Sequence, residues 1–286
     1  MDVTPQMDDE QAKLWNGVAG RAWVEAQAVT DQMFKPLEEL LAAAIPAGFD
    51  GLVVDVGCGT GSTTLAVARR LGVNGRCVGV DISEPMIAAA RVRAEREGTQ
   101  ARFICGNAQS HAFETASVDT IMSRFGVMFF DDSVRAFANL RRAARDNAAL
   151  RFVAWRSVAE NPFMTTAEQA AAPVLPDIPA RQLDAPGQFA FADPRRVYRI
   201  LEESGWTDID IQPIDVPCTL PEKELIGYVT RFGPLGRMLD GADEQTLARV
   251  VETVRPAFAS YVHGAEVHFN AACWMVNARA SSRPSA

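Results

Sequence analysis

The sequence has few of the residues that build metal centres and disulfide frameworks. Its 286 residues include five cysteines and three histidines. The cysteines lie far apart, and no two of them form a Cys-x-x-Cys pair. Zinc sites and disulfide scaffolds depend on closely spaced or paired cysteines. We therefore expect neither a metal site nor a disulfide framework, and the scattered thiols favour a reducing, cytoplasmic location.

Long apolar runs and excess positive charge are also missing. No stretch is apolar over the roughly 20 residues that a membrane helix needs, and the acidic, polar start of the chain is unlike a signal peptide. The formal net charge is −8. Because an acidic surface repels phosphate backbones, we expect no membrane span and no nucleic-acid partner. The 48% of hydrophobic residues are instead typical of a folded globular protein.

Short apolar segments alternate with helical ones from residue 51 onward. Strands are predicted at 52–56, 77–81, 102–105, 118–123 and 150–155, with helices at 62–71, 85–97 and 133–144. A helix at 193–204, a strand around Ile209 and Ile211, and a last strand at 267–276 complete the series. Such alternation predicts an α/β fold with a largely parallel sheet covered by helices on both faces.

Three regions do not follow this alternation. Residues 11–45 have apolar residues at helical spacing, and Pro46 and Gly48 end that segment. Residues 157–192 contain five prolines around a short helical piece, and residues 222–262 are irregular but helical. We interpret the last two as cap insertions over the sheet. The predicted organisation is an N-terminal helical segment, 1–48, followed by one domain, 49–286.

A glycine-rich turn, Gly57-Cys58-Gly59-Thr60-Gly61, joins the first predicted strand to its helix. Glycines there allow a tight turn and close approach of the backbone to a ligand. The spacing G-x-G-x-G differs from the dinucleotide fingerprint G-x-G-x-x-G. Asp81 ends the next strand, 20 residues after Gly61, where a carboxylate can accept the hydroxyl protons of a ribose. Each feature alone is compatible with mere packing or helix capping, but together they favour an adenosine site.

The segment from Val53 to Gly61 resembles motif I of the class I S-adenosylmethionine (SAM)-dependent methyltransferases. The likeness continues through Asp81, residues 106–108, 119–130 and 150–155. It implies a Rossmann-like, seven-stranded, mostly parallel sheet whose last strand, near 264–276, is antiparallel. It also implies that SAM is the cofactor and that the cofactor site contains ten residues, namely Asp55, Gly57, Gly59, Gly61, Asp81, Ile82, Met86, Asn107, Ala108 and Ser123.

The resemblance also implies what these residues do. The glycine loop passes under the methionine portion of SAM, and Asp55 orders the loop and faces the ammonium group. Asp81 holds the ribose, while Ile82 and Met86 pack on the adenine. Asn107 and Ala108 contact the adenine edge. Many members of the family have aspartate where this chain has Asn107, but an amide can still bond to a purine edge.

Two further segments are candidates for the acceptor site. The loop after the fourth strand carries Arg124, Phe125, Met128 and Phe129, whose rings and thioether either line an apolar pocket or belong to the core. Arg124 either meets an acidic substrate group or pairs with a nearby carboxylate, and we favour the pairing. In the N-terminal segment Trp15 and Trp23 either cover the cofactor, which would make residues 1–48 a lid, or pack against the sheet.

The sequence thus predicts methyl transfer from SAM to a small molecule, with the acceptor atom (O, N, S or C) left open. No histidine is a convincing general base, and no catalytic residue is assigned. Two alternatives remain, a SAM-binding regulatory protein without catalysis and an NAD(P)-dependent oxidoreductase. A protein or tRNA substrate is less favoured, because the chain is acidic and has no added RNA-binding module.

Overall fold

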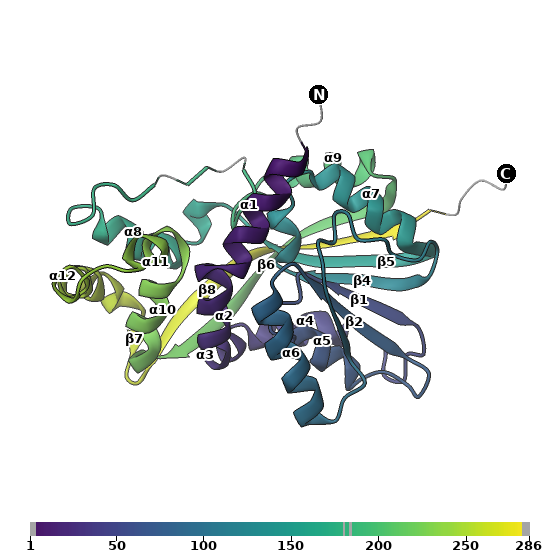
Figure 1. Ribbon diagram of the computed structural model, residues 1–286, viewed down its shortest axis with the longest axis horizontal. Coiled ribbons are helices and arrows are strands. Elements are labelled where there is room, and N and C mark those ends of the chain that lie inside the picture. The colour runs from purple at the N-terminus through teal and green to yellow at the C-terminus, as the bar shows by residue number, and fades with distance from the viewer. Residues whose placement is uncertain (1–3, 180, 183–184, 282–286) are drawn as a thin grey trace.

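The computed structural model describes residues 4–179, 181–182 and 185–281. Four short helices come first: α1 (Thr4–Asn16), α2 (Val18–Glu25), α3 (Gln27–Met33) and α4 (Lys35–Ala43) (Figure 1). The helical prediction for 11–45 is therefore right in type, but the chain breaks at Gly17, Ala26 and Phe34. Glycine is a poor helix former, which explains the break at Gly17. A proline in the first turn of α4 prevents a continuous helix through Phe34, which explains the break there.

The sheet has the predicted mixed topology. Its strands are β1 (Leu52–Val56), β2 (Arg76–Asp81), β3 (Arg102–Cys105), β4 (Val118–Arg124), β5 (Ala144–Trp155), β6 (Trp206–Pro221), β7 (Val262–His263) and β8 (Glu266–Ala280). Seven of them follow the order β3-β2-β1-β4-β5-β8-β6. β1 to β5 are parallel, and β8 is antiparallel to both β5 and β6. The eighth strand, β7, has two residues and pairs with β8, too short for sequence alternation to reveal.

Helices cover both faces of the sheet. In Figure 1, α4, α5 (Ser62–Ala68) and α6 (Glu84–Glu97) lie below the strands, while α7 (Ser133–Ala143) and α9 (Pro194–Glu203) lie above them. The upper layer is anchored by Trp206, whose indole N–H donates to the carbonyl of Phe137 at 3.1 Å. The rings of Phe137, Phe152 and Phe191 fill the space between α7, α9 and the sheet. These contacts pack α7 and α9 onto the sheet.

Two element boundaries differ from the prediction. α5 ends at Ala68 instead of residue 71, because Leu71 forms a parallel bridge with Phe49. β5 begins at Ala144 rather than at 150, and Asn147 has a φ of 62°. Asparagine tolerates this left-handed conformation better than most residues. The segment before the fifth strand therefore pairs as an irregular strand extension.

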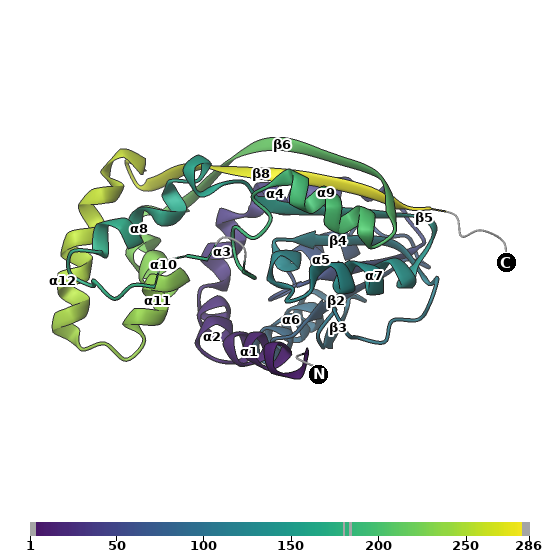
Figure 2. The same cartoon turned by 90° about the horizontal axis from the view of Figure 1, so that it is seen from above.

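The two predicted cap regions form a separate lobe. It contains η2 (Val158–Glu160), α8 (Phe163–Ala171), η3 (Glu222–Glu224), α10 (Leu225–Arg231), α11 (Gly233–Leu239), α12 (Glu244–Val254) and η4 (Arg255–Tyr261). Figure 2 shows this lobe beyond one end of the sheet, at the far end of β6 and β8. β6 is longer than predicted because it continues past the sheet to carry the lobe, whereas β8 exceeds the predicted 267–276 mainly at its other end, where residues 277–280 pair with β5 and β6. Of the predicted insertion 157–192, residues 180, 183 and 184 lie outside the described residues.

Side chains tie the lobe to β8. Asn161 donates to the carbonyl of Ala272 and accepts its N–H, each at 2.9 Å. The ring of Phe163 stacks on Phe269, with centroids 4.1 Å apart. Within the described ranges, no helix is long and apolar enough to cross a membrane, and no group of three or more His, Cys, Asp or Glu residues is placed to hold a metal ion.

Candidate functional site

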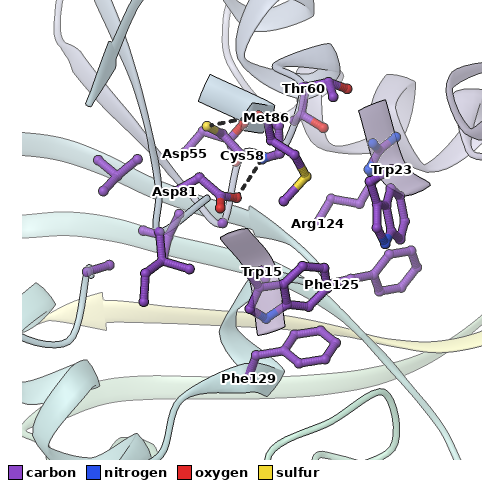
Figure 3. Close-up of a pocket in the computed structure, with 18 of the residues that line it drawn as sticks. Trp15, Trp23, Asp55, Cys58, Thr60, Asp81, Met86, Arg124, Phe125 and Phe129 are labelled. Atoms are coloured by element: carbon purple, nitrogen blue, oxygen red, sulfur yellow. Dashed lines mark hydrogen bonds between the residues drawn. The ribbon is translucent and has the colours of Figure 1, made fainter. Parts of the chain in front are cut away.

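A pocket of about 140 Å³ opens at the carboxyl ends of β1, β2 and β4. Ligands of open parallel sheets bind at this edge. Eight of the ten predicted cofactor residues line the pocket: Asp55, Gly57, Gly59, Asp81, Ile82, Met86, Asn107 and Ala108. Figure 3 shows Asp55, Asp81 and Met86 around it, with the rings of Trp15, Phe125 and Phe129 on another side. Gly61 and Ser123 each follow or precede a lining residue in the sequence but do not line the pocket themselves.

The glycine turn has three left-handed residues with different neighbours. Gly57, Gly59 and Gly61 have φ values of 66°, 55° and 87°. A Cβ on Gly57 would lie 2.5 Å from Cα of Gly126, so this glycine permits two backbone turns to touch. A Cβ on Gly61 would lie 2.9 Å from the ring of Phe103, which makes Gly61 a packing position. A Cβ on Gly59 would have only Met86 Sδ within 4 Å, at 3.7 Å, so the turn faces open space at this residue.

Asp81 connects the glycine turn to the next strand. Its Oδ2 accepts the N–H of Gly59 at 2.8 Å, and its Oδ1 accepts the N–H of Ser83 at 2.9 Å. Burial raises the pKa of Asp81, while these backbone donors favour the ionised form. A carboxylate has about four acceptor positions. Two hydrogen bonds therefore leave Asp81 able to accept further donors from the pocket.

Asp55 lies at the end of β1 and is fully buried. The hydroxyl of Thr64 donates to its Oδ2 at 2.6 Å. Burial raises the pKa of Asp55 to about 6, although Thr64 and the Arg124 guanidinium favour the carboxylate. A lone buried carboxylate is costly without a partner of opposite charge. The pocket is therefore suited to a cationic group beside Asp55.

The opposite end of the pocket is formed by apolar and amide groups. Met86 is buried in the first turn of α6, and Ile82 lies between β2 and that helix. Asn107 and Ala108 follow β3, where Asn107 Oδ1 accepts the N–H of Gln109 at 2.9 Å. Asn139 on α7 donates to the carbonyl of Ala108 at 2.9 Å. This wall combines apolar contact with a fixed amide edge.

Ser123 does not line the pocket but contacts the loop that does. Its hydroxyl accepts the N–H groups of Gly126 and Val127 at 3.1 and 3.3 Å. These bonds shape the short helix η1 (Gly126–Phe129), which follows β4. Phe125 immediately before it has a φ of 69°. Ser123 thus positions the loop that carries Phe125 and Phe129 into the pocket.

Arg124 does not form the ion pair that we favoured from the sequence. Among the described residues no carboxylate lies in salt-bridge contact with it, and Nη1 makes a long hydrogen bond of 3.4 Å to the carbonyl of Phe34. Burial lowers the pKa of its guanidinium, and Asp31, Glu38 and Asp55 oppose that shift from a distance. The nearby acids are occupied elsewhere: Arg93 pairs with Asp31 at 2.8 Å and Lys35 with Glu38 at 2.8 Å. Arg124 is therefore a half-buried cation on the pocket wall.

The N-terminal helices are bonded directly to the pocket. Ser83 donates its hydroxyl to the carbonyl of Trp15 at 2.6 Å. Asn16 accepts the N–H of Glu84 at 2.8 Å and so caps α6 from outside the domain. Arg93, paired with Asp31, also donates to the carbonyl of Thr60 at 2.8 Å. The sequence did not identify these partners, because each bond joins residues tens of positions apart.

A second, larger chamber adjoins the pocket between the N-terminal helices and the lobe. Its volume is about 460 Å³. Five aromatic residues line both cavities: Trp15, Trp23, Phe34, Phe125 and Phe129. The ring of Trp15 meets Phe129 edge-on at 5.0 Å, and Phe125 stacks on Trp155 at 4.6 Å. Met128 lines only the chamber. The predicted acceptor residues therefore come together, with Arg124 facing the smaller pocket.

The three histidines lie outside both linings. His111 packs against the ring of Phe113, and His263 and His268 lie together at the β7–β8 hairpin. Sequence reasoning missed Tyr228 and three arginines of the chamber, because the irregular cap regions have no motif that marks them. It also missed Trp155, which was predicted only as the end of a strand.

Comparisons with known proteins agree with this geometry. A family model described as a methyltransferase domain matches residues 53–147. An uncharacterized protein of Mycobacterium tuberculosis is 27% identical over 127 residues, covering 44% of this chain and 45% of that protein. Nocamycin O-methyltransferase of Saccharothrix syringae is 28% identical over 120 residues, covering 42% of this chain and 43% of that enzyme. The chain thus aligns with less than half the length of these curated relatives.

A solved structure extends the likeness to the whole fold. The YcgJ protein from Bacillus subtilis superposes with a TM-score of 0.57 at 17% identity, covering 86% of this chain and 98% of that chain. The segment matched by the family model spans β1 to β4, the glycine turn after β1 and Asp81 at the end of β2. Residues 53–147 thus match the methyltransferase domain family, and the chain as a whole shares its α/β fold with that solved structure.

Proposed function

We propose that this protein transfers a methyl group from SAM to a small-molecule acceptor. The observation that carries the proposal is the convergence of the glycine turn, Asp55 and Asp81 on one pocket that adjoins an aromatic chamber. The smaller cavity takes the cofactor and the larger one takes the acceptor. The net charge of −8 supports a small molecule rather than a nucleic acid as the acceptor.

The pocket residues match the chemical groups of SAM. Asp81 retains acceptor capacity for the ribose hydroxyls, and Asp55 supplies negative charge for the ammonium group. Ile82 and Met86 offer apolar surface to the adenine, and Asn107 offers an amide to its edge. The open side of Gly59 leaves room for the methionine portion.

When bound, SAM supplies an electrophilic methyl group on a sulfonium. The chain's part is to orient the acceptor and to exclude water, which can contribute several kcal/mol to such a reaction. The rings that separate the two cavities also favour a neighbouring cation by roughly 0.5–2 kcal/mol each. Because Trp15 and Trp23 line both cavities, we propose that residues 1–48 act as a lid over them.

Calorimetric titration tests the cofactor. We expect micromolar binding of SAM and S-adenosylhomocysteine (SAH), and no binding of NADH. Binding of NADH alone would favour an oxidoreductase instead. SAM binding without transfer of its labelled methyl group to any compound in an acceptor panel would favour a regulatory protein. Absence of binding of either adenosyl ligand would contradict the proposal.

A pair of glycine variants tests the turn itself. Gly59 and Gly98 both have left-handed φ values, 55° and 62°, and a Cβ on Gly98 meets no atom within 4 Å. Gly59→Ala and Gly98→Ala therefore carry a similar backbone strain of about 1 kcal/mol. Only Gly59→Ala places a methyl group towards the pocket. We expect it to weaken SAH binding at least about tenfold, whereas Gly98→Ala binds as the wild type does; equal binding by both variants would remove Gly59 from the site.

A further inference from the structure

The chamber has an unusual charge for this chain. The protein has 36 acidic and 28 basic residues. Yet the described residues that line the chamber include no Asp, Glu or His, while three are arginines: Arg181, Arg231 and Arg237. Among the described residues, the charged side chains around this cavity are therefore all positive, in a protein whose net charge is negative. We propose that the acceptor is a flat aromatic molecule with an ionised carboxylate, held by Arg231 and Arg237; this rests on the methyltransferase function proposed above.

The aromatic part of the acceptor follows from the other walls. Trp15 and Phe129 form one edge-on pair, and the parallel rings of Phe125 and Trp155 form another surface. On the lobe side, Phe232 lies 5.1 Å from the ring of Trp23. Aromatic rings gain stacking or edge contacts in such surroundings beyond simple area burial. A planar ring system fills the cavity better than a polar or branched chain would.

The charge of the wall is only partly neutralised. Arg181 is held by both carboxylate oxygens of Glu168, at 2.9 and 2.6 Å, and donates to Gln188 at 3.0 Å. Within the described part of the chain, neither Arg231 nor Arg237 has an ion-pair partner. Two guanidinium groups therefore remain available to an anion from the chamber.

Arg237 and Arg231 are exposed residues of the chamber wall. Partial burial lowers the pKa of the Arg237 guanidinium, and the positive charge of Arg181 lowers it further, while Glu168 opposes the shift. Two neighbouring cations repel each other unless a negative group lies between or beside them. An arginine fork also matches a carboxylate through two parallel hydrogen bonds. A carboxylate in the chamber would therefore complement the guanidinium groups of Arg231 and Arg237.

Matched aromatic acids and amides test the inference. Benzoate, 2-naphthoate and 2-anthroate, each paired with its carboxamide, are titrated calorimetrically into the protein saturated with SAH. We expect at least one acid to bind about tenfold or more tightly than its amide. In the double variant Arg231→Gln/Arg237→Gln we expect that preference to fall below about threefold.

The control variant is Arg249→Gln, an exposed arginine on α12 that lines neither cavity. It should keep the wild-type preference for the acid. Equal binding of every acid and its amide by the wild type would overturn the inference, as would a preference that survives in the double variant. SAH is titrated into every variant first, so a loss of SAH binding contradicts the proposed function, whereas SAH binding without an acid preference contradicts only this inference.

Discussion

Asp55 illustrates how a single buried group prepares a site for a cation. Its carboxylate is removed from water, so the pKa rises to about 6. The ordinary value is 3.8. Because the folded protein binds this proton more tightly than the unfolded chain, the contribution of Asp55 to stability falls as pH rises from about 4 to 6. A bound ammonium group reverses this cost by favouring the ionised form.

This behaviour predicts a pH-dependent affinity. If the carboxylate binds the ammonium group, only ionised Asp55 is competent, and at pH 5 about one tenth of it is ionised. We expect SAH to bind about tenfold more weakly at pH 5 than at pH 7.5, with the change centred near 6, as measured by calorimetry. In Asp55→Asn the affinity should be lower and much flatter across this range. A wild-type profile that stays flat would place the ammonium group away from Asp55.

The residues that the sequence identified are those close together in the chain. Asp55, Gly57 and Gly59 lie in one turn, and Asp81 follows the next strand at a characteristic distance. Gly61 and Ser123 belong to the same motifs but face the packing behind the pocket. Asp31 and Arg93 could not be found in this way. Their contact depends on how α3 lies against α6, which no local pattern encodes.

At the scale of elements, the junction between the sheet and the lobe depends on one buried side chain. Asn161 lies just before α8 and satisfies both the N–H and the carbonyl of Ala272 on β8. The carbonyl of Ala272 also accepts the N–H of Arg156 at 3.0 Å, whereas the N–H of Ala272 donates to Asn161 Oδ1. A buried donor without a partner costs about 1–3 kcal/mol.

We therefore expect Asn161→Ala to lower the free energy of unfolding by about 1–3 kcal/mol. The matched control is Asn270→Ala on the same strand, where an exposed amide donates to Asp215 at 2.9 Å. A surface substitution of this kind changes stability by about 0.5 kcal/mol or less. Urea unfolding of both variants measures the difference. Similar stabilities would mean that the lobe is held by ring stacking at Phe163 rather than by Asn161.

The elements themselves were predictable where the sequence pattern is local. Strand-helix alternation located β1 to β5 and the helices between them, since buried parallel strands have apolar runs with turn residues at their ends. β6 was predicted too short. Its outer half, with Cys218, is buried by the lobe rather than by sheet helices, so its length depends on tertiary packing.

The whole molecule has two cavities joined through the N-terminal helices. α1 is bonded to the β2–α6 turn through Trp15 and Asn16, and Trp15 of α1 and Trp23 of α2 line both cavities. If these helices form a lid, cofactor binding should slow their local opening. α12 is part of the lobe but lines neither cavity, so it is an internal reference.

Hydrogen exchange followed by mass spectrometry measures that opening. On addition of SAH we expect increased protection of amides in residues 10–25 and 106–109, and unchanged exchange in α12. The first two segments line or cover the pocket, and the third does not. Unchanged exchange in residues 10–25 at saturating SAH would show that the N-terminal helices are a fixed wall.

Five aromatic side chains belong to the walls of both cavities, and this sharing has a thermodynamic consequence. Any ligand that orders these rings from one side changes the surface met by a ligand on the other side. Linkage requires the effect to be reciprocal. The factor by which SAH tightens an acceptor must equal the factor by which that acceptor tightens SAH, so either ligand, titrated in the presence of the other, reports the same coupling energy.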